Sequence, residues 1–268
     1  MRIPLLALLL LSLAAAPIGI ADDNPEDFAA VLVPLTSRGL PGAHGSVWDA
    51  ELHIFNASRF ELRVPAENSV GQPVPPPPRV VVGPGETKNV QFLPGLSPFE
   101  EGTFLYIPKT MLDSVKLSLR VRDTSQNATS LGDEVPVVRS EQFAGDLTLF
   151  DVPVDPKYRA TLRIYGFTYA PMPVRVTVYP EDGQTALARF DVELRGIAIL
   201  VAVVFPAHPA WIAIDPLTDA VRSAAAGSRV RIEISNLAST LGYPQSSIWG
   251  FVSLTNNETN QVTLVTPK

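Results

Sequence analysis

The segments WDAELHIF (Trp48–Phe55) and YRATLRIY (Tyr158–Tyr165) share one pattern of residue types and begin 110 positions apart. Alternate residues in each segment are apolar, which is the period of a β-strand that buries one face. The opposite face of each segment is mostly polar. The predicted core-facing residues are Trp48, Ala50, Leu52 and Ile54 in the first segment and Tyr158, Ala160, Leu162 and Ile164 in the second. The two segments therefore predict equivalent strands of a duplicated unit.

Two further matches extend this correspondence along the chain. RVVV from Arg79 matches RFDV from Arg189 at the same offset of 110 positions. SLRVRDTSQN from Ser118 resembles FVSLTNNETN from Phe251, but at an offset of 133 positions. The second copy would then hold about 23 extra residues before Phe251. Three matches in the same order favour internal duplication over chance.

The composition indicates an all-β protein with short strands and many turns. The chain has 26 prolines in 268 residues, about twice the usual share of about 5%, and proline is excluded from helix interiors and central strands. We predict two tandem immunoglobulin-like β-sandwich domains, covering residues 28–135 and 136–268. The segment PLTDAVRSAAAG from Pro216 predicts one short helix in the second domain. Only the sandwich architecture is predicted, because the cysteines of antibody domains are absent.

The N-terminus has the features of a secretory signal peptide over residues 1–21. A basic Arg2 precedes an apolar run from Leu5 to Ala16, and small residues follow at Gly19 and Ala21. This run is shorter than the roughly 20 residues of a membrane-spanning helix. The apolar run from Ile197 to Phe205 is also too short. We therefore expect a secreted, periplasmic or cell-surface protein with no transmembrane segment in its mature chain.

A longer stretch, VPLTSRGLPGAHGSVWDAELHIFNAS from Val33, combines a PGAxGxxW loop with an LxIxN strand. Together with the closing segments RVRDTSQN and FVSLTNNETN, it resembles a group of uncharacterised secreted bacterial proteins with tandem immunoglobulin-like β-sandwich repeats. The resemblance implies the fold, and it implies no activity, substrate or site. The second copy departs from the pattern, because Gly166 stands where the first copy has Asn56.

The sequence offers few residues for chemistry, and we predict a protein without enzymatic activity, cofactor or metal. It contains no cysteine, and none of the common hydrolase, metalloprotease or nucleotide-binding motifs is present. The formal net charge of −6 disfavours nucleic acid as a partner. His53 shares a predicted strand face with Asp49 and Glu51, which we interpret as a solvated face. Asp155 and Asp215, which each precede a proline, are typical of turns, and a calcium site formed by Asp151 and Asp155 is the alternative.

Aromatic side chains are the better candidates for binding, because they supply large, flat contact areas. Tyr165, Phe167 and Tyr169 alternate near a strand end and form the predicted exposed patch, whereas Trp48 and Trp249 are expected in the core. We predict a non-enzymatic binding or structural module with a protein or polysaccharide partner outside the cytoplasm. One alternative is a carbohydrate-binding or carbohydrate-active protein. Another is an assembly subunit or periplasmic chaperone that uses an edge strand, for which VTLVT from Val262 is the candidate.

Overall fold

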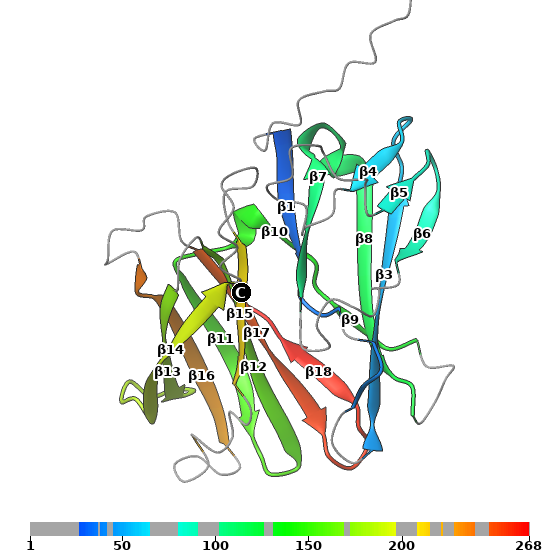
Figure 1. The fold of residues 1–268 in the computed structure, drawn as a ribbon. Helices are drawn as coiled ribbons and strands as arrows, with labels where there is room; N and C mark the ends of the chain where they lie inside the picture. Colours follow the sequence, from blue (N-terminus) through cyan, green and yellow to red (C-terminus); the bar gives the residue numbers. More distant parts are fainter. Residues whose placement is uncertain are drawn as a thin grey trace, which may run out of the picture.

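Antiparallel β-strands form nearly all the regular structure in a computed structural model of the chain (Figure 1). The structure describes residues 27–36, 38–41, 45–64, 80–90, 102–125, 131–168, 172–196, 208–214, 221, 228–238 and 247–267. The only other regular elements within these ranges are short 3-10 turns, including Lys109–Ser114 and Ser140–Gln142, and one helical residue, Val221. The prediction of an all-β sandwich-like fold is confirmed.

The strands fall into two sets, which lie side by side in Figure 1. The first set comprises β1 (Phe28–Val33), β2 (Leu40–Pro41), β3 (Val47–Asn56), β4 (Leu62–Val64), β5 (Val80–Val82), β6 (Thr87–Val90), β7 (Thr103–Pro108), β8 (Val115–Asp123), β9 (Asp133–Val135) and β10 (Val138–Arg139). The second comprises β11 (Asp146–Val154), β12 (Tyr158–Thr168), β13 (Met172–Pro180), β14 (Ala188–Gly196), β15 (His208–Ile214), β16 (Ser228–Asn236), β17 (Ser247–Asn256) and β18 (Val262–Val265).

Five antiparallel pairings of the first set recur in the second. The pairs β1–β7, β3–β6, β3–β8, β4–β5 and β8–β9 correspond to β11–β16, β12–β15, β12–β17, β13–β14 and β17–β18. β10 pairs with β1, so residues just beyond the predicted boundary at 135/136 belong to a sheet of the first set. The division of the chain into two domains stays a prediction.

The registers of the longest pairings reproduce both sequence offsets. Trp48 of β3 lies opposite Asp123 of β8, and Tyr158 of β12 lies opposite Asn256 of β17. Position 158 follows position 48 by 110 residues, and position 256 follows position 123 by 133 residues. Because the register depends on backbone pairing and not on similarity of side chains, it supports the alignment of the two copies independently.

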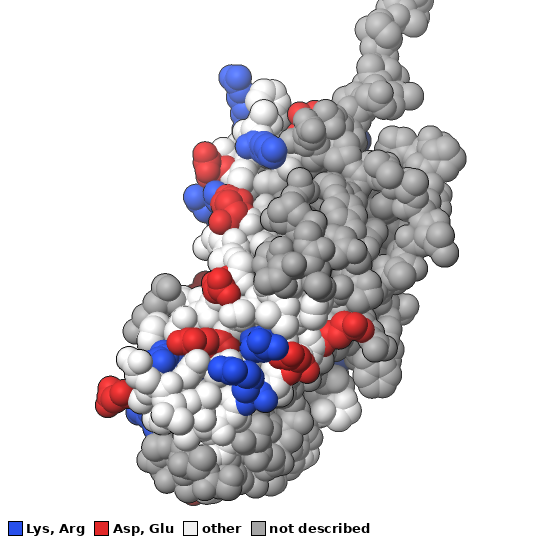
Figure 2. Space-filling view, turned by 90° about the vertical axis from the view of Figure 1, so that its left-hand side faces the viewer, with Lys and Arg blue, Asp and Glu red and all other residues white. Residues whose placement is uncertain are grey.

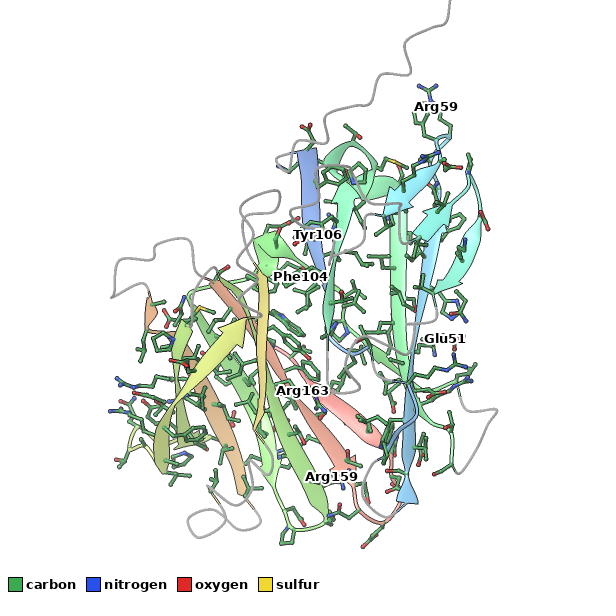
Figure 3. All side chains as sticks on the ribbon, in the orientation of Figure 1. Glu51, Arg59, Phe104, Tyr106, Arg159 and Arg163 are labelled. Atoms are coloured by element: carbon green, nitrogen blue, oxygen red, sulfur yellow. The ribbon has the colours of Figure 1, made fainter. Side chains whose placement is uncertain are left out.

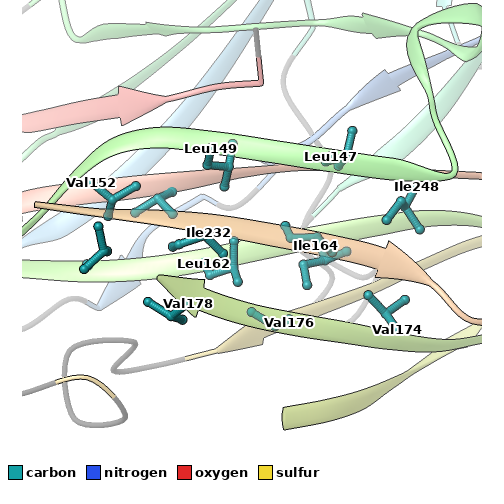
Figure 4. Close-up of a cluster of buried hydrophobic side chains, with 14 of the residues drawn as sticks. Leu147, Leu149, Val152, Leu162, Ile164, Val174, Val176, Val178, Ile232 and Ile248 are labelled. Carbon is teal, nitrogen blue, oxygen red and sulfur yellow. The ribbon is translucent and has the colours of Figure 1, made fainter. Parts of the chain in front are cut away.

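Each strand set has a core of its own. In the first, apolar side chains of β1, β3 and β7 meet those of β4, β5 and β8. In the second, one eight-stranded sheet runs from β11 to β18, and the short β14–β15 pairing links its halves. This sheet folds over so that β11 contacts β17 and β18. The buried side chains that fill the fold include Leu149, Leu162, Ile164, Val176 and Ile232 (Figure 4).

The predicted alternation along the two opening segments is confirmed at their centres. Leu52 and Ile54 are fully buried in the first core, and Leu162 and Ile164 are fully buried in the second. The predicted helix from Pro216 lies outside the described residues, except for Val221, which is helical and buried in the second core. The predicted signal peptide also lies outside the described residues.

Candidate functional site

An aromatic cluster joins the two strand sets. Phe104 and Tyr106 of β7 contribute from the first set, and Tyr165, Trp249 and Phe251 contribute from the second. All five side chains are buried. Trp249 is therefore in a core, as the sequence predicts, but this core lies between the two strand sets.

The predicted exposure of Tyr165 is wrong. Only 1% of this residue is accessible, and its hydroxyl donates a hydrogen bond to the backbone oxygen of Pro34 in the first set. The strand face that would otherwise meet solvent is covered here by the first strand set. Phe167 lies in β12, but its side chain and the whole of Tyr169 are outside the described residues. The predicted patch of three rings therefore cannot use Tyr165 as an open surface.

A cavity of about 400 Å³ lies next to this aromatic cluster, between the two strand sets. Its first wall is the core-facing side of sheet β2-β3-β8-β9. Leu52 is covered by the first core, but Trp48 and Ala50, farther along the same face of β3, line the cavity. Leu40 lies opposite Trp48, and Val121 lies opposite Ala50. The first wall is therefore largely apolar.

The second wall of the cavity is the outer face of β12, β17 and β18. It carries Arg159, Thr161, Arg163, Ser253, Thr255, Val262 and Leu264. The polar side chains predicted on the outer face of β12 therefore face the first strand set instead of open solvent, and Figure 3 shows both arginines between the two sets. Since burying a charged group against an apolar wall without partners costs free energy, a ligand or water in this cavity can supply those partners.

Arg159 and Thr255 are available to a ligand. They lie directly opposite each other across the β12–β17 pairing. Neither side chain makes a hydrogen bond or an ion pair within the described parts of the chain, although Thr255 is only 8% exposed. Arg163, by contrast, is held in place, because it donates to Ser253 Oγ at 2.6 Å and lies over the Phe251 ring.

Trp48 supplies a flat surface on the opposite wall. Its expected burial in the core is only half realised, because the strands that cover Leu52 do not extend this far along β3. Its indole nitrogen donates a hydrogen bond to Ser46 Oγ at 3.0 Å. This bond fixes the orientation of the ring. The sequence could not identify this ring as a site residue, since alternation gives the face of a strand and not where the opposing layer ends.

Two carboxylates complete the lining of the cavity. Asp49 Oδ1 accepts the backbone N–H of Gly39 at 2.6 Å. Burial raises the pKa of Asp133, and a hydrogen bond from the backbone of Val262 opposes this shift without cancelling it. In the folded protein, ionised Asp133 is therefore destabilised relative to the unfolded chain.

Replacing Asp133 by asparagine is expected to stabilise the protein at pH 7. Because the pKa of Asp133 is raised in the folded protein, its ionised form lowers the free energy of unfolding at pH values above this pKa. This loss of stability disappears as the pH falls and Asp133 becomes protonated. Asparagine keeps an oxygen for Val262 and carries no charge. Urea midpoints measured at pH 7 and at a series of lower pH values should show the advantage of Asp133→Asn shrinking with acidity. An advantage that grows on acidification would contradict this assignment.

The edge of β18 is partly occupied. β18 pairs with β17 on one side and ends the eight-stranded sheet. On its other side, the backbone of Val262 is engaged by the Asp133 side chain of β9, and Leu264 packs against both the first core and the aromatic cluster. The segment VTLVT, which is the candidate edge strand for assembly, therefore lies between the two strand sets.

The other candidate residues have structural partners. His53 Nε2 lies 3.6 Å from Glu51 Oε1 on an outer strand face. Asp151 pairs with Arg229 at 2.5 Å, and Asp155 accepts the backbone N–H of Lys157 at 2.9 Å. Within the described ranges, no three histidine or acidic side chains are placed to hold a metal ion. On the face shown in Figure 2, acidic and basic side chains are interleaved.

Comparison of the chain with protein-family models, curated proteins and solved structures finds no match. The described residues include no helix that is long and apolar enough to cross a membrane. The candidate site is a cavity with an apolar wall, a polar wall, one half-buried indole and four charged side chains.

Proposed function

We propose that this chain is an exported, non-enzymatic binding protein that takes its ligand in the cavity between the two strand sets. The observation that carries the proposal is the pairing of an apolar wall with a wall of arginine and hydroxyl side chains. Binding sites commonly combine a mainly apolar lining with a few placed polar groups, in volumes of roughly 300–1,000 Å³. The cavity of about 400 Å³ lies within that range.

Export is supported by the signal-peptide pattern of residues 1–21. The resemblance to secreted bacterial repeat proteins agrees with it. The aromatic cluster between the strand sets supports a fixed geometry, because buried contacts on both sides of the interface hold the walls of the cavity together. A preformed site of this kind binds with little cost for ordering the protein.

Retention on native material tests this function. The chain without residues 1–21 is incubated with cell envelopes and with extracellular polysaccharide from the producing organism, and the bound fraction is quantified. We expect saturable retention that is lost in Ala50→Phe, because a ring at this position fills the cavity. The matched control is His53→Phe, which introduces the same residue on the opposite face of β3.

The control should be retained as well as the natural protein. Treating the material with glycosidase or with protease before incubation shows whether the retained partner is a polysaccharide or a protein. Absence of retention on every fraction, or full retention of a folded Ala50→Phe variant, would overturn the proposal.

A further inference from the structure

We propose that the cavity binds a neutral sugar unit, with the Trp48 ring against its apolar face and with Arg159 and Thr255 hydrogen-bonded to its hydroxyls. This inference rests on the proposed function and names the class of its ligand. The aromatic residue for binding is therefore Trp48, which belongs to the first strand set and lines the cavity. Tyr165 of the second set is buried and is not available to a ligand.

The charges around the cavity favour a ligand without net charge. Arg159 and Arg163 contribute two positive charges, and Asp49 and Asp133 contribute two negative charges. The described lining is therefore formally neutral. A charged ligand would need an excess of the opposite charge to offset its loss of hydration.

Hydroxyl groups match this mixture of partners. Arginine only donates hydrogen bonds and an ionised carboxylate only accepts them, whereas a hydroxyl does both. A polyhydroxylated ring can therefore satisfy Arg159 and Asp133 from one molecule. Thr255 is nearly buried as a residue, but its hydroxyl lies on the cavity wall without a partner among the described residues, and a ligand would satisfy it.

The two walls also match the two kinds of surface on a sugar ring. The outer face of β12 and β17 carries the polar side chains, and Trp48, Ala50 and Val121 oppose it with apolar surface. Pyranose rings present C–H groups on their faces and hydroxyls around their edges, so that one face can lie on an indole. On the scale of about 30 Å³ for each water, the cavity of about 400 Å³ has room for about a dozen water molecules. One sugar ring, whose bonded atoms lie closer together than separate waters, fits in this volume with part of the water retained.

Titration with defined sugars tests the inference. The neutral probes are glucose, galactose, mannose and N-acetylglucosamine, and the acidic probes are glucuronate and galacturonate. Binding is followed by calorimetry and by tryptophan fluorescence. We expect at least one neutral sugar to bind with a dissociation constant of about 1 mM or below, and to bind at least tenfold more tightly than either acidic sugar.

Variants link this binding to the cavity. Trp48→Ala and Arg159→Ala should each weaken it by tenfold or more, whereas Trp48→Phe should retain part of it. Arg189→Ala is the control, because Arg189 is an exposed arginine of β14 and does not line the cavity. Circular dichroism shows that each variant remains folded.

The outcomes separate the sugar assignment from the binding function. Preference for the acidic sugars, or neutral-sugar binding that survives both Trp48→Ala and Arg159→Ala, would overturn the assignment. So would failure of every sugar to bind while Ala50→Phe still abolishes retention on native material, and in that case the binding function would stand. Retention that is unaffected by Ala50→Phe would instead remove the binding function itself.

Discussion

Replacing Asn56 by aspartate is expected to lower the free energy of unfolding by about 3 kcal/mol, although the two side chains have nearly the same shape. Asn56 is completely buried at the end of β3. Its amide nitrogen lies 2.8 Å from the backbone oxygen of Phe60, 3.0 Å from that of Val82 and 3.2 Å from that of Gly83. A carboxylate at this position would face three carbonyl oxygens with no proton to donate.

The other half of the amide is also engaged. Asn56 Oδ1 accepts the backbone N–H of Ser58 at 3.0 Å and the Ser58 hydroxyl at 2.7 Å. One side chain therefore ties the turn after β3 to the end of β5. Because breaking this network leaves buried carbonyl groups without partners, its loss costs more than the loss of one exposed hydrogen bond.

Chemical denaturation of Asn56→Asp at neutral pH measures this loss. Asn257→Asp is the matched control, because the Asn257 amide nitrogen makes a single described side-chain hydrogen bond, 3.1 Å to the Pro156 oxygen, near the surface. The control should change stability by well under 1 kcal/mol. Equal urea midpoints for the two variants would show that the Asn56 network contributes little.

Sequence alternation could predict which face of each strand is apolar, and could not predict which outer faces are covered by a second layer. Leu52 and Leu162 are buried as their positions in the period-two pattern require. Tyr165 lies on the opposite face of β12 from Leu162, so the same pattern places it toward solvent. It is buried because β1 and β7 of the first strand set pack over that end of β12.

The sequence could not predict the candidate site, for the same physical reason. Arg159, Thr161 and Arg163 have the residue types of a solvated strand face, and Trp48 has the position of a core residue. They line one cavity only because the second strand set lies over the end of sheet β2-β3-β8-β9. That arrangement depends on the contact between two halves of the chain, for which a periodic pattern within one strand carries no information.

Replacing Tyr165 by alanine is expected to cost about 4 kcal/mol, because it removes a large side chain from the core that joins the strand sets. The Tyr165 ring stacks on Phe251, with centroids 6.3 Å apart and an angle of 9° between the planes. It also packs tightly against Gly102, whose φ is +122° and where an added Cβ would lie 3.0 Å from Tyr165 Cε1.

Tyr165→Phe isolates the hydrogen bond from the packing. It keeps the ring and removes only the hydroxyl that donates to Pro34, so the expected cost is about 1–2 kcal/mol. The control is Tyr179→Ala, because Tyr179 is half-buried on an outer strand face, where its ring contacts Arg231. That variant should cost clearly less than Tyr165→Ala.

Calorimetry on the three variants tests whether this contact couples the two strand sets. We expect one unfolding transition in the natural protein, because the aromatic cluster requires both sets to be folded together. In Tyr165→Ala we expect two transitions, because each strand set keeps a core of its own. The midpoint temperature of the first should lie about 10 °C below that of the natural protein. Two well-resolved transitions already present in the natural protein, or a Tyr165→Ala midpoint no lower than that of Tyr179→Ala, would show that the sets are not coupled through Tyr165. The walls of the cavity would then lack the fixed separation on which binding of a single sugar unit depends.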